Sequence, residues 1–217
     1  MLYVVGPADA PKGDWKALKG KKVAIAMPGN MPDLVFSYLL KKNGLDRKDI
    51  EVVNAADGQQ AMQKLASGEA DYAVLPEHAA TLAQAKLKEK GKETARVFNL
   101  QEEWAKVTGK KARFPMAGLV MPGKLVDSRP GLPAAVRAEV KASVDKANAG
   151  DPATLQAIAD HYKLPVDVVK QVIPRLQLDV VPAKEAKADY EDFLKRLGEV
   201  NPKIYGGKLP DDKFYAE

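Results

Sequence analysis

The turn at residues 28–32 holds the residues best suited to binding chemistry. Gly29 allows a ligand to approach the backbone closely, and Asn30 offers both a hydrogen-bond donor and an acceptor. Met31 and Asp33 follow where a helix is expected to begin. A glycine turn that opens a helix exposes free N–H groups at the positive end of the helix dipole, which suits a carboxylate, sulfonate or phosphate. The same pattern also serves as an ordinary turn and cap, so it permits either interpretation.

Four further residues could add polar or aromatic contacts. Asp57 follows a short apolar run and is placed to cap a helix. Glu77 and His78 follow another apolar run; Glu77 could contact a ligand, or the pair could simply open a helix, where a carboxylate is favourable. Phe114 stands before a proline and could stack on a ligand or pack at a hinge.

No catalytic or metal-binding pattern accompanies these residues. The chain has no Cys and only two His, which excludes disulfides, zinc–thiolate sites and cysteine nucleophiles. Neither a G-x-S-x-G elbow nor a nucleotide-binding G-x-x-x-x-G-K-[ST] loop is present. We therefore expect a binding protein rather than an enzyme, with no metal and no cofactor.

The composition is typical of a globular protein, with 46% hydrophobic and 29% charged residues among 217. The net charge of +5 is spread over lysine-rich stretches with acids interleaved, which indicates solvated faces rather than a nucleic-acid groove. No apolar run approaches the ~20 residues of a transmembrane helix. No signal peptide is visible at Met1, which implies a cytoplasmic protein if Met1 is the true start.

Short apolar runs alternate with amphipathic segments over the first half of the chain. Strands are expected at residues 2–5, 23–27, 50–53, 72–75, 95–100 and 116–121, and helices at 33–43, after Asp57, at 78–90 and at 101–107. This order predicts an α/β lobe with a mostly parallel sheet flanked by helices. In such a sheet, ligands bind beyond the carboxyl ends of the strands, where the candidate residues lie.

The second half of the chain is nearly all helical. Apolar residues recur every four positions at Leu132, Val136, Val140 and Val144, and further amphipathic helices are expected to open at Asp151 and near Leu164, with a last one near residues 190–197. We therefore expect two parts: an α/β ligand-binding lobe at residues 1–121 and a C-terminal helical segment at residues 122–217.

Three phrases carry a resemblance to a known family: DWKALKGKKVAIA at residues 14–26, LASGEADYAVLPE at residues 65–77 and GGKLPDDKFY at residues 206–215. They resemble the second lobe and the chain end of periplasmic solute-binding proteins of ABC transporters, in the branch that serves nitrate, sulfonates, taurine and thiamine-pyrimidine precursors. The resemblance implies a periplasmic protein that binds a small organic molecule or anion and delivers it to an ABC permease.

The same resemblance implies that a first lobe is missing. In the family, a first α/β lobe of comparable size precedes this one, the ligand sits between the lobes, and the C-terminal helices pack on the first lobe. Because those helices would otherwise expose apolar stripes, we expect a homodimer to cover them. Two alternatives remain: a non-transport module for binding, oligomerisation or sensing built on the same lobe, and a small enzyme similar to those of the menaquinone pathway.

Overall fold

The computed structural model describes residues 1–215, which form two compact units. The first unit contains residues 1–114 and 194–207, and the second contains residues 115–193 and the described part of the chain from residue 208. This division differs from the expected one in two places: the break falls after Phe114, and residues 194–207 return to the first unit. The return is made within one helix, α9 (Ala183–Gly198), whose last turns pack with the first unit.

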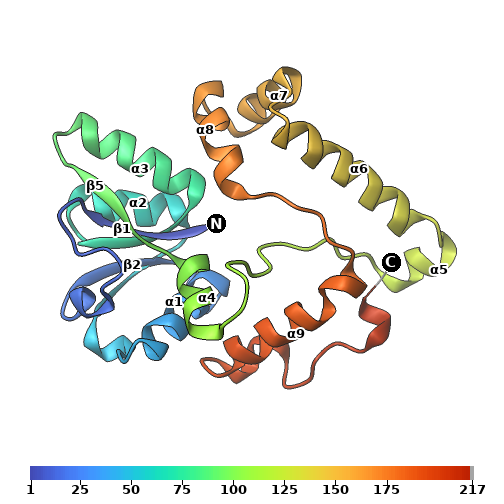
Figure 1. Cartoon of the computed structure of the whole chain (residues 1–217), viewed down its shortest axis with the longest axis horizontal. Helices are drawn as coiled ribbons and strands as arrows, with labels where there is room; N and C mark the ends of the chain where they lie inside the picture. Colours follow the sequence, from blue (N-terminus) through green and yellow to red (C-terminus); the bar gives the residue numbers. More distant parts are fainter. Residues whose placement is uncertain (216–217) are drawn as a thin grey trace. The chain divides into compact units, whose positions relative to one another are not determined.

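A five-stranded sheet in the order β3-β2-β4-β1-β5 forms the centre of the first unit (Figure 1). Its strands are β1 (Leu2–Pro7), β2 (Lys22–Ala26), β3 (Glu51–Ala55), β4 (Tyr72–Pro76) and β5 (Thr94–Asn99). Strand β2 is parallel to β3 and β4, whereas β1 is antiparallel to both β4 and β5. Four strands therefore share one direction and β1 alone opposes them. The predicted α/β fold is confirmed, but the sheet is mixed rather than mostly parallel, because β1 is inserted between β4 and β5 and makes two antiparallel ladders.

Helices cover both faces of this sheet. Helices α2 (Gly58–Ser67) and α3 (Glu77–Glu89) pack on one face, and α1 (Met31–Lys42) and α4 (Leu100–Thr108) pack on the other. The α2–α3 face buries mainly small and aliphatic side chains, with Ala24, Ala73 and Ala80 fully enclosed. The opposite face is aromatic: Trp15, in the short helix η1 (Trp15–Leu18), packs with its ring tilted against Phe36 and Phe98.

The second unit is built from helices. They are α5 (Gly123–Ser128), α6 (Leu132–Asn148), α7 (Pro152–Tyr162), α8 (Val166–Leu176) and the first part of α9. Asp151 caps α7 by accepting a hydrogen bond from the amide of Thr154, as its place before a proline indicates. A small core of five buried residues joins α6, α7 and α8: Ala147, Leu155, Ala159, Val169 and Ile173.

The C-terminal tail packs against α9 through aromatic contacts and an ion pair within the second unit. The rings of Tyr190 and Phe214 stack with centroids 6.3 Å apart, and Lys187 pairs with Asp212. Burial raises the pKa of Tyr215 to about 12, and its hydroxyl donates to Glu191. The helices η2 (Arg47–Asp49), η3 (Pro202–Tyr205) and η4 (Asp212–Phe214) complete the described elements.

The strand predicted at residues 116–121 is wrong. This stretch is irregular and joins no ladder of the described sheet, and Leu119 and Val120 are 64% and 75% exposed. An apolar run becomes a strand only where another strand offers backbone partners, and no strand of residues 1–215 pairs with this stretch. Among the described residues no helix is long and apolar enough to cross a membrane.

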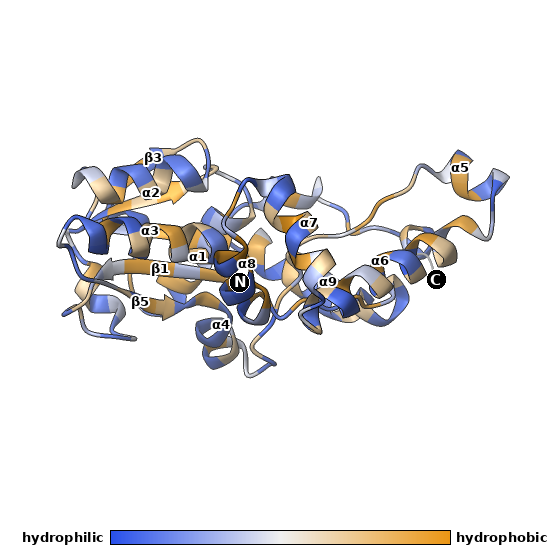
Figure 2. Ribbon diagram, turned by 90° about the horizontal axis from the view of Figure 1, so that it is seen from above, coloured by the Kyte–Doolittle hydropathy of each residue, from blue (hydrophilic) through white to orange (hydrophobic). Residues whose placement is uncertain are grey.

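The second unit also leaves much apolar surface open. In the described residues, seven of the eight exposed large hydrophobic side chains belong to it: Met116, Leu119, Val120, Leu125, Tyr162, Val181 and Phe214. The stripe of Leu132 and Val136 on α6 is only half-buried, and Figure 2 shows hydrophobic and hydrophilic residues mixed along this helix. The apolar side chains of α6 are therefore only partly buried within their own unit.

We predict that this surface drives formation of a homodimer, because apolar patches beyond a few hundred Å² are uncommon in soluble monomers. Light scattering coupled to size-exclusion chromatography should give twice the chain mass of 23.5 kDa. Leu119→Glu with Val120→Glu should shift the species toward monomer, while Lys92→Glu, an exposed change in the first unit, should leave it unchanged. A wild-type chain that stays monomeric at high micromolar concentration would contradict the dimer.

Gly6 in β1 is expected to tolerate no side chain. A Cβ at this position would overlap the ring of Tyr72 on the neighbouring strand β4, and both residues are buried. Gly6→Ala should therefore lower the free energy of unfolding by about 1–3 kcal/mol through overpacking, measured by urea denaturation. Gly118→Ala is the matched control, because a Cβ there meets nothing within 4 Å; an equal loss in both variants would refute the argument.

Candidate functional site

Four helix N-termini converge on one edge of the sheet. Helices α1, α2, α3 and α4 each begin within a few residues of the end of β2, β3, β4 and β5, respectively. Strand β1 starts at this same edge, since Leu2 pairs with Pro76 and Tyr3 with Asn99. Helix N-termini present unsatisfied N–H groups and a positive partial charge, so this edge is suited to an anion or to polar oxygen atoms.

The turn between β2 and α1 has a defined shape. The amide of Asn30 donates to the carbonyl of Met27 over 3.0 Å, and Pro28 and Gly29 occupy the central positions. Gly29 has φ of 79°, which the third position of a type II turn requires, and Met27 also lies in the left-handed region with φ of 51°. The exposed side chain of Asn30 makes no capping hydrogen bond to α1 and faces solvent at the edge.

The buried side chain of Asp33 stabilises this turn by hydrogen bonding. It accepts hydrogen bonds from the amide of Gly29 over 2.8 Å and from the hydroxyl of Ser37 over 3.2 Å, and it pairs with Arg47. Asp33 is 5% exposed. The amides of Gly29 and Asn30 and the carboxylate of Asp33 are thus engaged within the chain, and their role at the edge is to shape the turn.

Asp57 caps α2 as its sequence context predicts. Its carboxylate accepts a hydrogen bond from the amide of Gln60 over 2.8 Å, and the side chain is exposed. The neighbouring Gly58 lies against Pro76 at the end of β4, where a Cβ would approach the proline ring to 3.2 Å. The start of α2 can therefore sit close to the start of α3.

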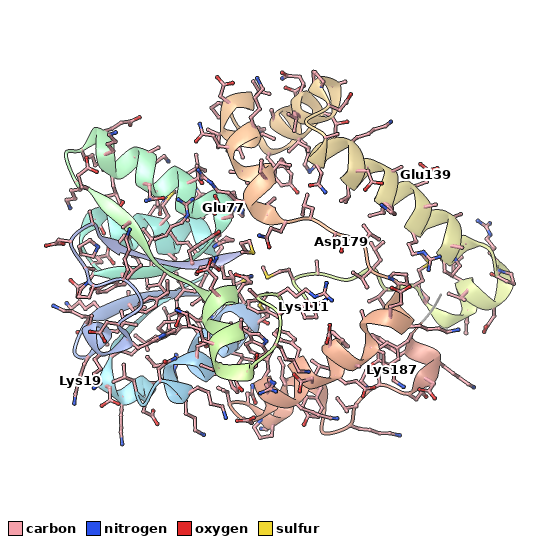
Figure 3. The ribbon with its side chains drawn as sticks, viewed as in Figure 1. Lys19, Glu77, Lys111, Glu139, Asp179 and Lys187 are labelled. Atoms are coloured by element: carbon pink, nitrogen blue, oxygen red, sulfur yellow. The ribbon has the colours of Figure 1, made fainter. Side chains whose placement is uncertain are left out.

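Glu77 is fully buried at the start of α3, labelled in Figure 3. Arg96 of β5 donates to Glu77 Oε1 and to Thr81 Oγ1, each over 2.8 Å, and Thr81 donates to the same carboxylate oxygen. The Arg96 guanidinium also lies over the ring of Tyr3. Glu77 therefore anchors α3 from inside.

His78 is exposed at the edge. Desolvation by the surrounding protein lowers its pKa, and the carboxylate of Glu77 opposes that shift. A neutral imidazole at neutral pH carries one donor and one acceptor nitrogen, so it can contact a polar ligand without adding charge.

Phe114 closes an aromatic column on the α1–α4 face. Its ring packs edge-on against Trp104 at 5.5 Å, and Trp104 lies 5.1 Å from Tyr38. Arg196 of α9 donates to the hydroxyl of Tyr38 over 3.0 Å. With 7% of its surface exposed, Phe114 packs at the end of the first unit.

The structure thus divides the predicted site residues into two groups. Asn30, Asp57 and His78 are exposed at the edge and Met31 is half-buried there, whereas Asp33, Glu77 and Phe114 are engaged inside the unit. Sequence reasoning missed Arg47 and Arg96, which pair with the two buried acids. The ion pair of Arg96 could have been predicted from the sequence, because a charged residue within an apolar strand needs a partner inside the protein. In the described part of the chain no group of three or more His, Cys, Asp or Glu could hold a metal ion.

The sequence matches one family over most of its length. A family model described as ABC transporter, phosphonate, periplasmic substrate-binding protein matches residues 1–157. The chain belongs to this family. YtlA, a protein of Bacillus subtilis strain 168 whose name describes it as a candidate binding protein, is 34% identical over 85 residues, which are 39% of this chain.

Solved structures of similar fold include an ABC transporter protein from Parabacteroides distasonis, with a TM-score of 0.69 and 20% identity, and the periplasmic aliphatic sulphonate binding protein SsuA from Escherichia coli, with a TM-score of 0.70 and 13% identity. The alkanesulfonate-binding protein SsuA from Xanthomonas axonopodis, bound to MOPS, gives a TM-score of 0.62 at 14% identity and is matched over 67% of its length by 99% of this chain. At these identities the likeness establishes the fold.

The proteins compared are longer than this chain. The whole chain aligns with 70% of the P. distasonis protein and 65% of the E. coli protein, and the B. subtilis match spans 25% of that protein. About a third of each solved neighbour therefore has no counterpart in the present sequence.

Removing the carboxylate of Asp33 should destabilise the first unit. Asp33→Ala leaves the amide of Gly29, the hydroxyl of Ser37 and the guanidinium of Arg47 without their acceptor. We expect a loss of about 1–3 kcal/mol in the free energy of unfolding, measured with urea. Asp57→Ala, which removes an exposed cap, should cost about 1 kcal/mol, and a larger loss there than at Asp33 would contradict this ranking.

Proposed function

We propose that this chain is the ligand-binding part of a solute-binding protein that serves an ABC importer. The observation that carries the proposal is the convergence of four helix N-termini on one sheet edge in a chain that belongs to the periplasmic substrate-binding family. Loops at the carboxyl ends of parallel strands are the usual ligand site of open α/β sheets. The ligand is proposed to contact Asn30, Met31, Asp57 and His78 at this edge.

The proposed ligand is a small organic molecule with an anionic head, such as a sulfonate or phosphonate. Helix N-termini supply N–H donors and positive potential for the head. The turn at residues 28–32 holds no Lys or Arg, so the ligand is expected to be recognised by dipoles rather than by a charge clamp. Met27 is 40% exposed beside the turn and offers an apolar contact for the organic part.

The proposed partners follow from the family. An ABC permease would receive the ligand, in the periplasm, and a further lobe would complete the protein, supplied within a longer polypeptide or by another chain. The family match favours this function over the sensing or oligomerisation module and over the menaquinone-pathway type of enzyme. We propose binding without turnover.

Asn30 provides the direct test of the site. Asn30→Ala should weaken binding of ethanesulfonate or ethylphosphonate by about 1–3 kcal/mol in calorimetry, because the ligand atom that it pairs with would be left buried and unpaired. Asn43→Ala, at the opposite end of the same helix, is the matched control and should bind as the wild type does. Unchanged affinity in Asn30→Ala for a ligand that the wild type binds would remove Asn30 from the site.

A further inference from the structure

Helices α1 and α3 carry the same buried arrangement in their first turns. In α1, Asp33 accepts from Ser37, four residues later, and Arg47 contacts both Asp33 and Ser37. In α3, Glu77 accepts from Thr81, also four residues later, and Arg96 contacts both. We call each set an acid–hydroxyl–arginine triad. The two triads lie on opposite faces of the sheet, behind the ends of the neighbouring strands β2 and β4.

The buried carboxylates are concentrated at this one edge. The three that are buried among the described residues, Asp33, Glu77 and Glu103, all belong to first turns of helices that begin there. Glu103 also has a cation, Lys106, and accepts from Trp15. Several other ion pairs of the described chain, such as Lys141 with Asp145, have both partners exposed. The buried acids therefore lie where a ligand at this edge would be sensitive to their charge.

The charges of the two triads affect how strongly this edge attracts an anionic ligand. A carboxylate in the first turn stabilises its helix, yet it also cancels the positive potential that the helix N-terminus offers to an anion. The guanidinium of each triad offsets the carboxylate, and it can do so strongly because the acids are withdrawn from water: their side chains are 7% and 0% exposed. With the arginine in place, the helix N-terminus regains its attraction for an anionic group.

We propose that Arg47 and Arg96 are positioning residues that neutralise the buried carboxylates at the starts of α1 and α3 and so keep this edge receptive to an anion. The inference rests on the proposed function for the identity of the ligand. It adds that Arg47, through Asp33, also holds the amide of Gly29 and thereby the turn that carries Asn30.

The test compares four chains: wild type, Arg96→Gln, Glu77→Gln and the double variant. Arg96→Gln removes the guanidinium that pairs with Glu77 and should weaken ethanesulfonate binding about tenfold. The double variant lacks the ion pair but carries no excess charge, so its affinity should return to within about threefold of the wild type. Arg96→Lys should keep most of the affinity because it keeps the charge.

A purely structural role predicts the opposite order. The double variant would then bind as weakly as Arg96→Gln or more weakly, and that result would overturn the proposal. Lys64→Gln, which breaks the ion pair with Glu69 at the far end of α2, is the control and should not change the affinity. The set Arg47→Gln, Asp33→Asn and their double variant repeats the comparison at α1.

A measurement without ligand separates this inference from the proposed function. His78 adjoins Glu77 and its pKa responds to that carboxylate, so its NMR titration reports the potential at the edge. Glu77→Gln leaves the charge of Arg96 without this carboxylate and should lower the pKa of His78, and adding Arg96→Gln should raise it again. Equal values in all four chains would refute the neutralisation, whereas a wild type that binds no sulfonate or phosphonate would refute only the proposed function.

Discussion

Charge buried at the helix starts is the constraint on which the first unit depends. Each strand of the common direction passes almost at once into a helix, so unsatisfied N–H groups gather at one edge. Carboxylates in the first turns stabilise those helices, but a carboxylate that is 0% or 5% exposed needs a partner inside the protein. Arg47 and Arg96 are these partners, 14 and 19 residues away in the sequence. The two ion pairs thereby join η2 to the start of α1 and β5 to the start of α3.

The position of β1 is the second constraint. It is inserted between β4 and β5 and opposes both, so the first residues of the chain complete the middle of the sheet rather than an edge. The amide of Leu2 donates to the buried side chain of Gln101 over 3.0 Å, which joins the start of β1 to the first turn of α4. Gly6 near the other end of β1 gives the ring of Tyr72 its space. The first contact joins β1 to α4 at the edge where the helices begin, and the second lets β1 lie close to β4 at the opposite edge.

The two units differ in how fully they cover their own apolar residues. The first has a continuous core on each sheet face, whereas the second buries only a few side chains between α6, α7 and α8. Helices in proteins gain most of their stability from packing of an apolar face, so α6 with one fully buried residue, Ala147, is poorly supported within its own unit. This contrast agrees with our proposal that a further lobe or a second chain covers the helical unit.

The sequence by itself determined the local elements and the edge where the candidate site lies. Short apolar runs marked β1 to β5, and Asp57 and Asp151 marked helix starts, because capping is a local property of the chain. Only the tertiary structure decided which polar residues remain at the surface. From the sequence, Asp33 and Glu77 were as plausible ligand contacts as Asn30 and His78. In the structure both acids are buried and form ion pairs with Arg47 and Arg96, and such pairing depends on where distant segments meet. The stretch at residues 116–121 shows the same limit, since strand formation requires a neighbouring strand that the sequence pattern cannot supply.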